Sequence, residues 1–162
     1  MFKSLINTSD DIGPTIARLT LGIVYFPHGA QKVLGWFGGY GFSGTMDFFT
    51  NQMHIPAALA FLAICAEFLG SLGLLVGFLG RVAAFAIAFE MLVAVMMIHR
   101  HFGFFINWTG TQKGEGFEYH LLVLGLALIV MIKGSGRLSV DRSLTESAEG
   151  FSDLRARSAT ET

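Results

Sequence analysis

Three ionisable side chains stand in apolar stretches of the sequence, where a charge is costly to keep. Glu67 and Glu90 lie near the middle of two apolar runs, and His28 lies in the outer part of an earlier run. Inside a membrane such groups face protein or water, and they commonly take part in proton transfer. We therefore take these three residues as candidates for proton exchange. One alternative stays open for the two glutamates, which would then join neighbouring helices through ion pairs or hydroxyl groups.

The first apolar run also carries a polar face. Its members are Arg18, Tyr25, His28, Gln31 and Lys32. Spacings of three and four residues place side chains on one side of a helix. Groups of this kind can contact a lipid head group or the polar end of an amphiphilic ligand. Two alternatives remain open, in which Arg18 extends to the membrane interface and the other side chains cap or anchor the helix end.

The composition restricts the class of protein. The chain has 162 residues, of which 52% are hydrophobic and only 14% charged, and a net charge of −1. Soluble domains carry about 25% charged residues, so a membrane protein is predicted. The low charge excludes a disordered chain, and the lack of excess basic residues disfavours nucleic-acid binding. One cysteine leaves no internal disulfide. No metal site is predicted, since His99 and His101 would not share a helix face.

Four apolar stretches are long enough to cross a bilayer, which takes about 20 residues per helix. They are too long for strands and lack the alternation of porin-type barrels. The predicted fold is therefore all-α, an antiparallel bundle of four transmembrane helices. The predicted spans cover approximately residues 14–36, 56–79, 82–102 and 117–132. The predicted regions are a cytoplasmic N-terminal segment at 1–13, a membrane domain at 14–142 and a mobile cytoplasmic tail at 143–162.

Two connections have sequence signals of their own. Gly80 and Arg81 predict a tight turn, so the second and third spans should form an antiparallel hairpin. Met46, Phe49 and Met53 recur at helical spacing in the first outer loop, which predicts a short helix lying in the membrane interface. The hairpin brings Glu67 and Glu90 to similar depth, but the rotation of the helices, and so whether the two carboxylates face each other, is not determined.

Basic residues predict the orientation, because they are enriched in cytoplasmic loops. One side carries Lys3, Arg81, Lys133, Arg137, Arg142, Arg155 and Arg157. The other side carries Lys32, Arg100 and Lys113. Both termini are therefore expected in the cytoplasm of a prokaryotic cell, with the spans in its inner membrane.

Small residues form a stripe along the second span. The stripe consists of Ala63, Ala66, Gly70, Gly73, Gly77 and Gly80. Close backbone contact through small residues is a main source of helix association in lipid. The stripe therefore predicts that the second span packs tightly against a neighbouring helix.

The chain resembles the DoxX family of small four-helix membrane proteins over roughly residues 14–142. The matching blocks are Ala17-Arg18-Leu19 to His28-Gly29-Ala30-Gln31-Lys32, Pro56-Ala57, Ala66-Glu67-Phe68-Leu69-Gly70, Gly77, Arg81 and Gly134-Ser135-Gly136-Arg137-Leu138-Ser139-Val140-Asp141. The polar positions that match are Arg18, His28, Gln31, Lys32 and Glu67. Glu90 is outside the family pattern, so its role depends on its depth alone.

The resemblance implies an inner-membrane protein of a class often called oxidoreductase, with relatives associated with quinone-linked and thiol-linked redox complexes. Quinone is the one cofactor it suggests, and it would meet Arg18, Tyr25, His28, Gln31 or Lys32 while Glu67 exchanges protons. No flavin, haem or iron–sulfur motif is recognisable, so electrons would come from a partner redox subunit, and whether the chain is itself an enzyme stays open. The alternatives are an accessory scaffold that docks a partner, or a second copy, through the glycine stripe, and a proton-coupled small transporter.

Overall fold

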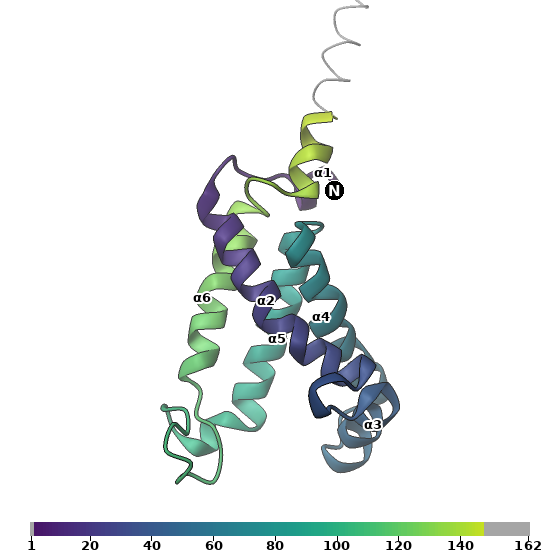
Figure 1. Ribbon diagram of the computed structural model, residues 1–162, viewed down its shortest axis with the longest axis vertical. Helices are drawn as coiled ribbons and strands as arrows, with labels where there is room; N and C mark the ends of the chain where they lie inside the picture. The colour runs from purple at the N-terminus through teal and green to yellow at the C-terminus, as the bar shows by residue number, and fades with distance from the viewer. Residues whose placement is uncertain (1, 148–162) are drawn as a thin grey trace, which may run out of the picture.

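The computed structural model describes residues 2–147, and within this range every regular element is a helix (Figure 1). The predicted all-α class is therefore confirmed. The long helices are α2 (Ile12–Leu34), α4 (Ala57–Val76), α5 (Gly80–Met97) and α6 (Glu118–Lys133). The short elements are α1 (Phe2–Ile6), η1 (Trp36–Gly38), α3 (Gly41–Asp47), the π-helix η2 (Phe48–Gln52) and η3 (His99–Phe102). Residues 140–147 form a further helical segment.

The long helices alternate in direction and form a bundle (Figure 1). Helix α2 packs on α4 and α6, and α5 packs on α4 and α6. We call the end that carries α1 and residues 140–147 the terminal end, and the end that carries α3 and residues 103–116 the loop end. Toward the loop end the α2–α4 pair diverges from the α5–α6 pair.

The boundaries of two predicted segments differ in the structure. The turn between α4 and α5 lies at Gly77–Leu79, where Gly77 takes a φ of 72° and Leu79 a φ of 50°, and Gly80 and Arg81 already belong to α5. Helix α5 ends at Met97, short of residue 102, because Ile98 leaves helical geometry. Of the predicted tail at 143–162, residues 143–147 are helical, and the remainder lies outside the described residues.

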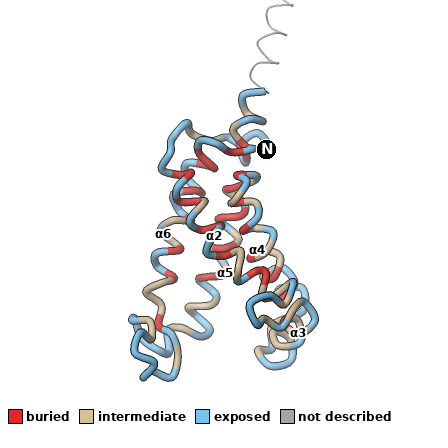
Figure 2. Tube along the Cα trace, viewed as in Figure 1, coloured by how far each residue is buried: buried red, intermediate tan, exposed pale blue. Residues whose placement is uncertain are grey.

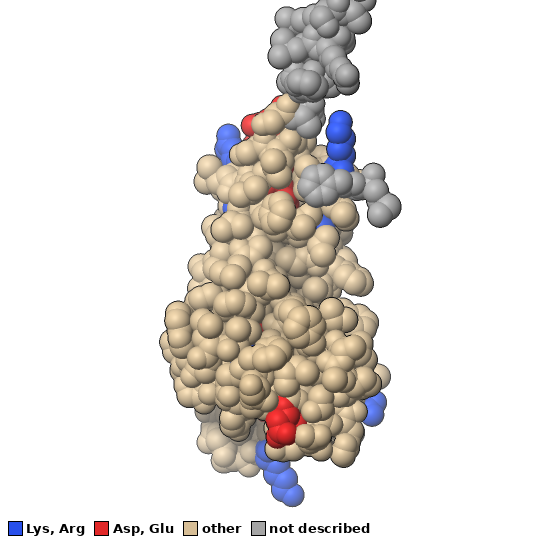
Figure 3. All heavy atoms as spheres, turned by 90° about the vertical axis from the view of Figure 1, so that its right-hand side faces the viewer, with Lys and Arg blue, Asp and Glu red and all other residues tan. Residues whose placement is uncertain are grey.

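Helices α4 and α5 are long and apolar enough to cross a membrane. Only 33% of the most apolar 18-residue window of each helix is buried, whereas a core helix of a soluble protein would be mostly covered. The exposed apolar surface suits contact with lipid. On the face shown in Figure 3, charged side chains lie toward the two ends of the molecule and leave an uncharged band between them. The other two long helices are less clear candidates for membrane spans by themselves. Helix α2 carries the charged residues Arg18 and Lys32, and α6 has only 16 residues.

Small residues hold α2 directly against α4. A Cβ atom added to Gly29 would lie 2.6 Å from the Cα atom of Phe68, and one added to Gly22 would lie 2.9 Å from Leu75. The stripe predicted along α4 has a different neighbour, because Gly70 and Gly73 face Ala83 of α5. Small residues thus bring α4 close to helices on two sides, as is usual for helices in lipid.

The remaining stripe glycines lie beneath the segment that follows α6. Gly77 contacts Ser139, and Gly80 contacts Ser135. Both glycines are buried. The stripe is therefore covered from within the chain at Gly70, Gly73, Gly77 and Gly80.

The terminal half of the bundle is closed by a continuous apolar cluster (Figure 2). Leu74, Ala84, Ile87, Ala127 and Val130 are all completely buried in it. Toward the loop end the helices are covered less completely.

A buried arginine fastens the terminal end. Arg18 is 1% exposed, and its guanidinium donates to the carbonyl oxygens of Ser135, Leu138, Leu74 and Leu75 at 2.7–2.8 Å. The last two acceptors lie in the final turn of α4, where helix carbonyls lack partners and favour a cation. We call the cluster of Arg18, Ser135, Leu138 and Asp141 the terminal latch.

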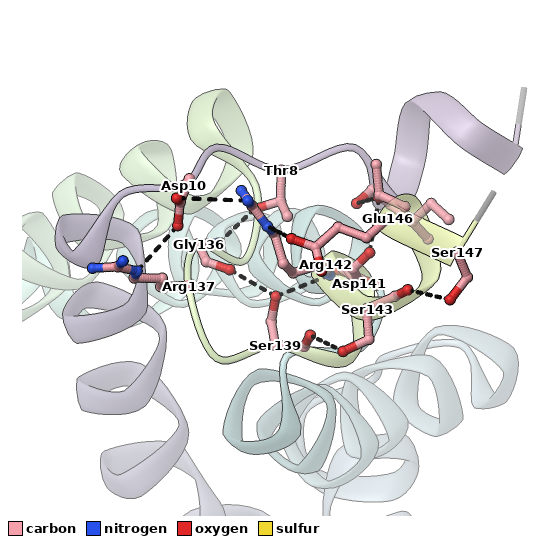
Figure 4. Close-up of polar contacts among 12 residues, drawn as sticks. Thr8, Asp10, Gly136, Arg137, Ser139, Asp141, Arg142, Ser143, Glu146 and Ser147 are labelled. Carbon is pink, nitrogen blue, oxygen red and sulfur yellow. Dashed lines mark hydrogen bonds and ion pairs between the residues drawn. The ribbon is translucent and has the colours of Figure 1, made fainter. Parts of the chain in front are cut away.

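Asp141 completes the terminal latch from the other side. Its carboxylate accepts from the backbone N–H groups of Leu79 and Gly80 at 2.8 and 3.1 Å, and from the Ser135 hydroxyl at 2.6 Å. It thereby caps the first turn of α5, where a negative charge is favourable. Figure 4 shows the surrounding contacts, in which Gly136 donates to Thr8 and the exposed Arg137 pairs with Asp10.

We expect Arg18→Lys to lower the stability of the protein markedly. A lysine keeps the charge but cannot reproduce a planar fork that reaches carbonyls of two separate segments. Loss of most of these hydrogen bonds should cost about 2 to 4 kcal/mol of unfolding free energy, measured by chemical denaturation in detergent. The control Arg137→Lys changes an exposed ion pair and should stay within about 0.5 kcal/mol of the original. Equal changes in unfolding free energy for the two variants would show that the hydrogen bonds of Arg18 do not stabilise the protein.

Candidate functional site

A cavity of about 360 Å³ lies in the loop-end half of the molecule. The helices that line it are α2, α4, α5 and α6, and η2 and η3 contribute at its border. Its walls are mainly apolar, with Met91, Ala94 and Met97 from α5 and Phe48 and Phe49 from η2. The polar residues that line it are Tyr25, His28, Lys32, Glu67, Glu90, His99, Tyr119 and His120.

An ion pair lies in the wall of this cavity. The Lys32 ammonium contacts the Glu67 Oε2 atom, linking α2 to α4. The Glu67 side chain is 7% exposed and the Lys32 side chain 22%. Glu90 of α5 interacts electrostatically with both residues. Two carboxylates and one ammonium therefore share a site of low polarity, and the three groups together are neutral when one carboxyl group carries a proton.

Polar atoms without hydrogen bonds concentrate around the cavity. Six buried side-chain oxygen or nitrogen atoms in the described part of the chain lack a hydrogen-bond partner, and five of them belong to cavity residues. These are Tyr25 Oη, Glu67 Oε2, Glu90 Oε2, Tyr119 Oη and His120 Nδ1. The Glu67 atom has its ion-pair contact with Lys32 but not the geometry of a hydrogen bond. Buried polar atoms are nearly always satisfied, so these atoms are expected to bind water or the polar groups of a ligand.

Two histidines meet at the border of the cavity. The ring centroids of His99 in η3 and His120 in α6 are 4.1 Å apart. The Nδ1 atom of His99 lies 2.8 Å from the carbonyl oxygen of Glu115 in the loop that joins these elements. Among the described residues, no group of three His, Cys, Asp or Glu side chains is arranged to hold a metal ion.

The structure gathers five of the predicted site residues and leaves two elsewhere. Tyr25, His28, Lys32, Glu67 and Glu90 all line the cavity. The helices α4 and α5 are therefore rotated so that Glu67 and Glu90 both line the same cavity.

Two predicted ligand contacts have other surroundings. The hydrogen bonds of Arg18 go to Ser135 and Leu138 of the terminal latch and to Leu74 and Leu75 at the end of α4, all of which lie outside the cavity. Gln31 donates from Nε2 to the carbonyl oxygen of Phe37 at 3.3 Å, and so supports the chain just after α2. The sequence of α2 alone does not predict which of its polar residues line the cavity, because their partners lie on other elements.

Tyr119, His99 and His120 line the cavity but are not among the predicted site residues. The Tyr119 and Tyr25 hydroxyls lie close enough to interact with each other, although neither meets the geometry of a hydrogen bond to the described residues. One signal was available, since all three residues flank the outer ends of predicted spans. Adjacent positions such as Tyr119 and His120 do not share one face of a helix, and both reach the cavity only because it ends at the first turn of α6.

The helices with exposed apolar faces and the buried ionisable groups define a helical membrane protein with a mainly apolar cavity that carries several polar groups. The DoxX family matches residues 13–100, and the chain belongs to this family.

Two curated relatives support the assignment. The chain is 29% identical over 137 residues to "Inner membrane protein YqjF" of Escherichia coli (strain K12), covering 85% of the chain and 95% of the relative. It is 26% identical over 136 residues to "Putative oxidoreductase CatD" of Bacillus subtilis (strain 168), covering 84% and 90%. No solved structure matches the chain.

We expect Lys32 and Glu67 to be energetically coupled. Lys32→Met or Glu67→Gln alone leaves a charge without its partner in a poorly hydrated site, which should cost on the order of 1 to 3 kcal/mol of unfolding free energy after allowance for the partly exposed lysine. The double variant should lose clearly less than the sum. A double-mutant cycle in detergent measures the difference.

The exposed pair Arg137 and Asp10 provides the matched control. Arg137→Met and Asp10→Asn should be additive within about 0.5 kcal/mol, because solvent screens that pair. Additivity in both cycles would show that the contact between Lys32 and Glu67 does not stabilise the fold.

Proposed function

We propose that this DoxX-family protein is a quinone-linked redox component of a prokaryotic inner membrane that acts with a partner subunit. A quinone head group would bind in the cavity, and the two glutamates would exchange protons there. The observation that carries the proposal is the concentration of buried polar atoms without a hydrogen bond around one mainly apolar cavity. Such a mixture of apolar walls and a few polar groups is typical of small-molecule sites.

The membrane arrangement is part of the proposal. We infer four spans, formed by α2, α4, α5 and α6, with α3 and η2 in the outer interface and both termini in the cytoplasm. Two of these helices are apolar enough to cross by themselves. Helix α2 would hide Arg18 and Lys32 inside the bundle, as charged residues in a membrane require. Arg81, Lys133, Arg137 and Arg142 all lie toward the terminal end, which supports a cytoplasmic position for that end.

Different cavity residues would bind the ligand and exchange protons. The Tyr25 and Tyr119 hydroxyls and the His28 ring offer hydrogen bonds to carbonyl oxygens. A bound quinone accepts two electrons and two protons on full reduction. Glu67, in its ion pair with Lys32, and Glu90 would hold and pass protons. Arg18 and Gln31 have structural contacts and drop out of the proposed ligand set.

The relatives support the class of function without specifying it. One carries the name of an inner membrane protein and the other that of an oxidoreductase. Electrons would be supplied by a partner. Docking of that partner through the glycine stripe is not favoured, because α5 and residues 135–139 already cover most of the stripe.

We expect purified protein to bind a short-chain benzoquinone, and Glu67→Gln and Tyr25→Phe to weaken the binding about tenfold each. Loss of one hydrogen bond or charge contact in a buried site costs about 1 to 1.5 kcal/mol, which corresponds to such a change in affinity. Equilibrium dialysis with the protein in lipid nanodiscs measures the dissociation constant.

Tyr40→Phe serves as the control, since Tyr40 is highly exposed and lies outside the cavity. Its affinity should equal that of the unchanged protein. If the benzoquinone does not bind, or binds all three variants equally, the cavity is not a quinone site.

A further inference from the structure

We propose that the cavity exchanges water, protons and ligand with the loop end only, and that the terminal half of the bundle is a permanent seal. This inference deepens the proposed function, because it assigns the side of the membrane that the proton-exchanging glutamates serve.

The cavity is restricted to one half of every helix that lines it. On α2 it begins at Tyr25 and extends to Lys32, and on α4 it ends at Glu67. On α5 it starts at Glu90, and on α6 it includes only the first turn, at Tyr119 and His120. Because the helices alternate in direction, these are the same half of the molecule in each case (Figure 1).

A continuous apolar layer follows directly beyond the cavity. Leu21 of α2, Leu74 of α4, Ile87 of α5 and Val123 of α6 are each at most 3% exposed and belong to one contact cluster. Interiors of this kind are packed to the density of organic crystals and leave no path for water. The polar side chain next to Glu67 in that direction is Ser71, which is completely buried and donates its hydroxyl to the Phe68 carbonyl oxygen. The layer beyond Ser71 is apolar, so this single hydroxyl does not connect the two glutamates to the terminal end.

The terminal latch closes the same end a second time. The Arg18 guanidinium donates to four carbonyl oxygens, and the Asp141 carboxylate accepts three hydrogen bonds. Groups whose hydrogen bonds are used in this way are not available as a proton relay. The charged residues at the terminal end are thus part of the seal and not of a pathway across the membrane.

Polar groups continue from the cavity toward the loop end instead. His28 is exposed, and His99 joins His120 to the Glu115 carbonyl group in the outer loop. His99 follows the end of α5 and His120 lies on the first turn of α6, so these two imidazoles lie beyond Glu90 toward the loop end and provide the route by which a proton would leave. His28 lies level with Glu67, because the adjacent Gly29 packs against the Glu67 and Phe68 backbone.

Cysteine accessibility tests the inference without knowledge of the ligand. With Cys65→Ala as background, Ala94→Cys and Ala63→Cys place a thiol on two cavity walls, and Ala84→Cys places one in the seal. Thr111→Cys and Ser143→Cys mark the loop end and the terminal end, where both residues are exposed. The probe is a charged, membrane-impermeant methanethiosulfonate, applied to spheroplasts and to inside-out vesicles.

We expect the two cavity thiols to react at least tenfold faster in the preparation that exposes Thr111→Cys than in the one that exposes Ser143→Cys. Ala84→Cys should stay unreactive in both. Comparable labelling of the cavity thiols from both sides, labelling from the terminal end alone, or labelling from neither side would each overturn the inference. If labelling is one-sided but the protein binds no quinone, the inference that the cavity opens only to the loop end stands, and only the proposal of a quinone ligand is contradicted.

Discussion

Burial of the Arg18 guanidinium determines how the terminal half of this protein is built. A buried cation is retained only if its N–H groups are satisfied, and here the acceptors come from the end of α4 and from the segment after α6. The two segments that supply these carbonyl oxygens turn sharply, at residues with a backbone geometry that favours glycine. Gly77 and Gly136 take φ values of 72° and 73°, and Gly77 leaves no room for a side chain beside Ser139 and Arg18.

Asp141 makes the same arrangement electrostatically consistent. Its carboxylate lies close enough to Arg18 for a favourable interaction and caps α5 at the same time. Three chain segments distant in sequence are thus fixed at one end. The helix pairs can then diverge at the other end without loss of the fold, and the cavity occupies the space that this divergence leaves.

The sequence alone predicts the helical class and the location of the long helices, because runs of apolar residues report directly on contact with lipid. It also predicts that Glu67 and Glu90 reach similar depth, since a hairpin fixes depth by residue count. It does not predict the partners of polar residues on α2. Arg18 and Lys32 share a helical face, yet one belongs to the terminal latch and the other to the cavity, because α4 meets each at a different level.

The glycine stripe of α4 is a second case in which the sequence does not predict the packing partner. Spacing alone identifies a smooth face but not its neighbour, which is α5 and the segment at 135–139. Tyr119, His99 and His120 are not among the predicted site residues, because their contacts with the cavity follow from the irregular connection between α5 and α6. Within the part of the chain that matches the family, Arg18 and Gly77 stabilise the terminal end, whereas His28, Lys32 and Glu67 line the cavity.

Photolabelling of membranes with a quinone that carries a photoreactive group, followed by peptide mass spectrometry, tests whether a quinone binds in the cavity. If it does, labels appear on peptides that contain the cavity residues 25–32, 90–99 and 119–120, and excess unmodified quinone suppresses them. Labels confined to lipid-facing residues such as Phe85 and Phe89, and unaffected by excess quinone, would contradict binding in the cavity.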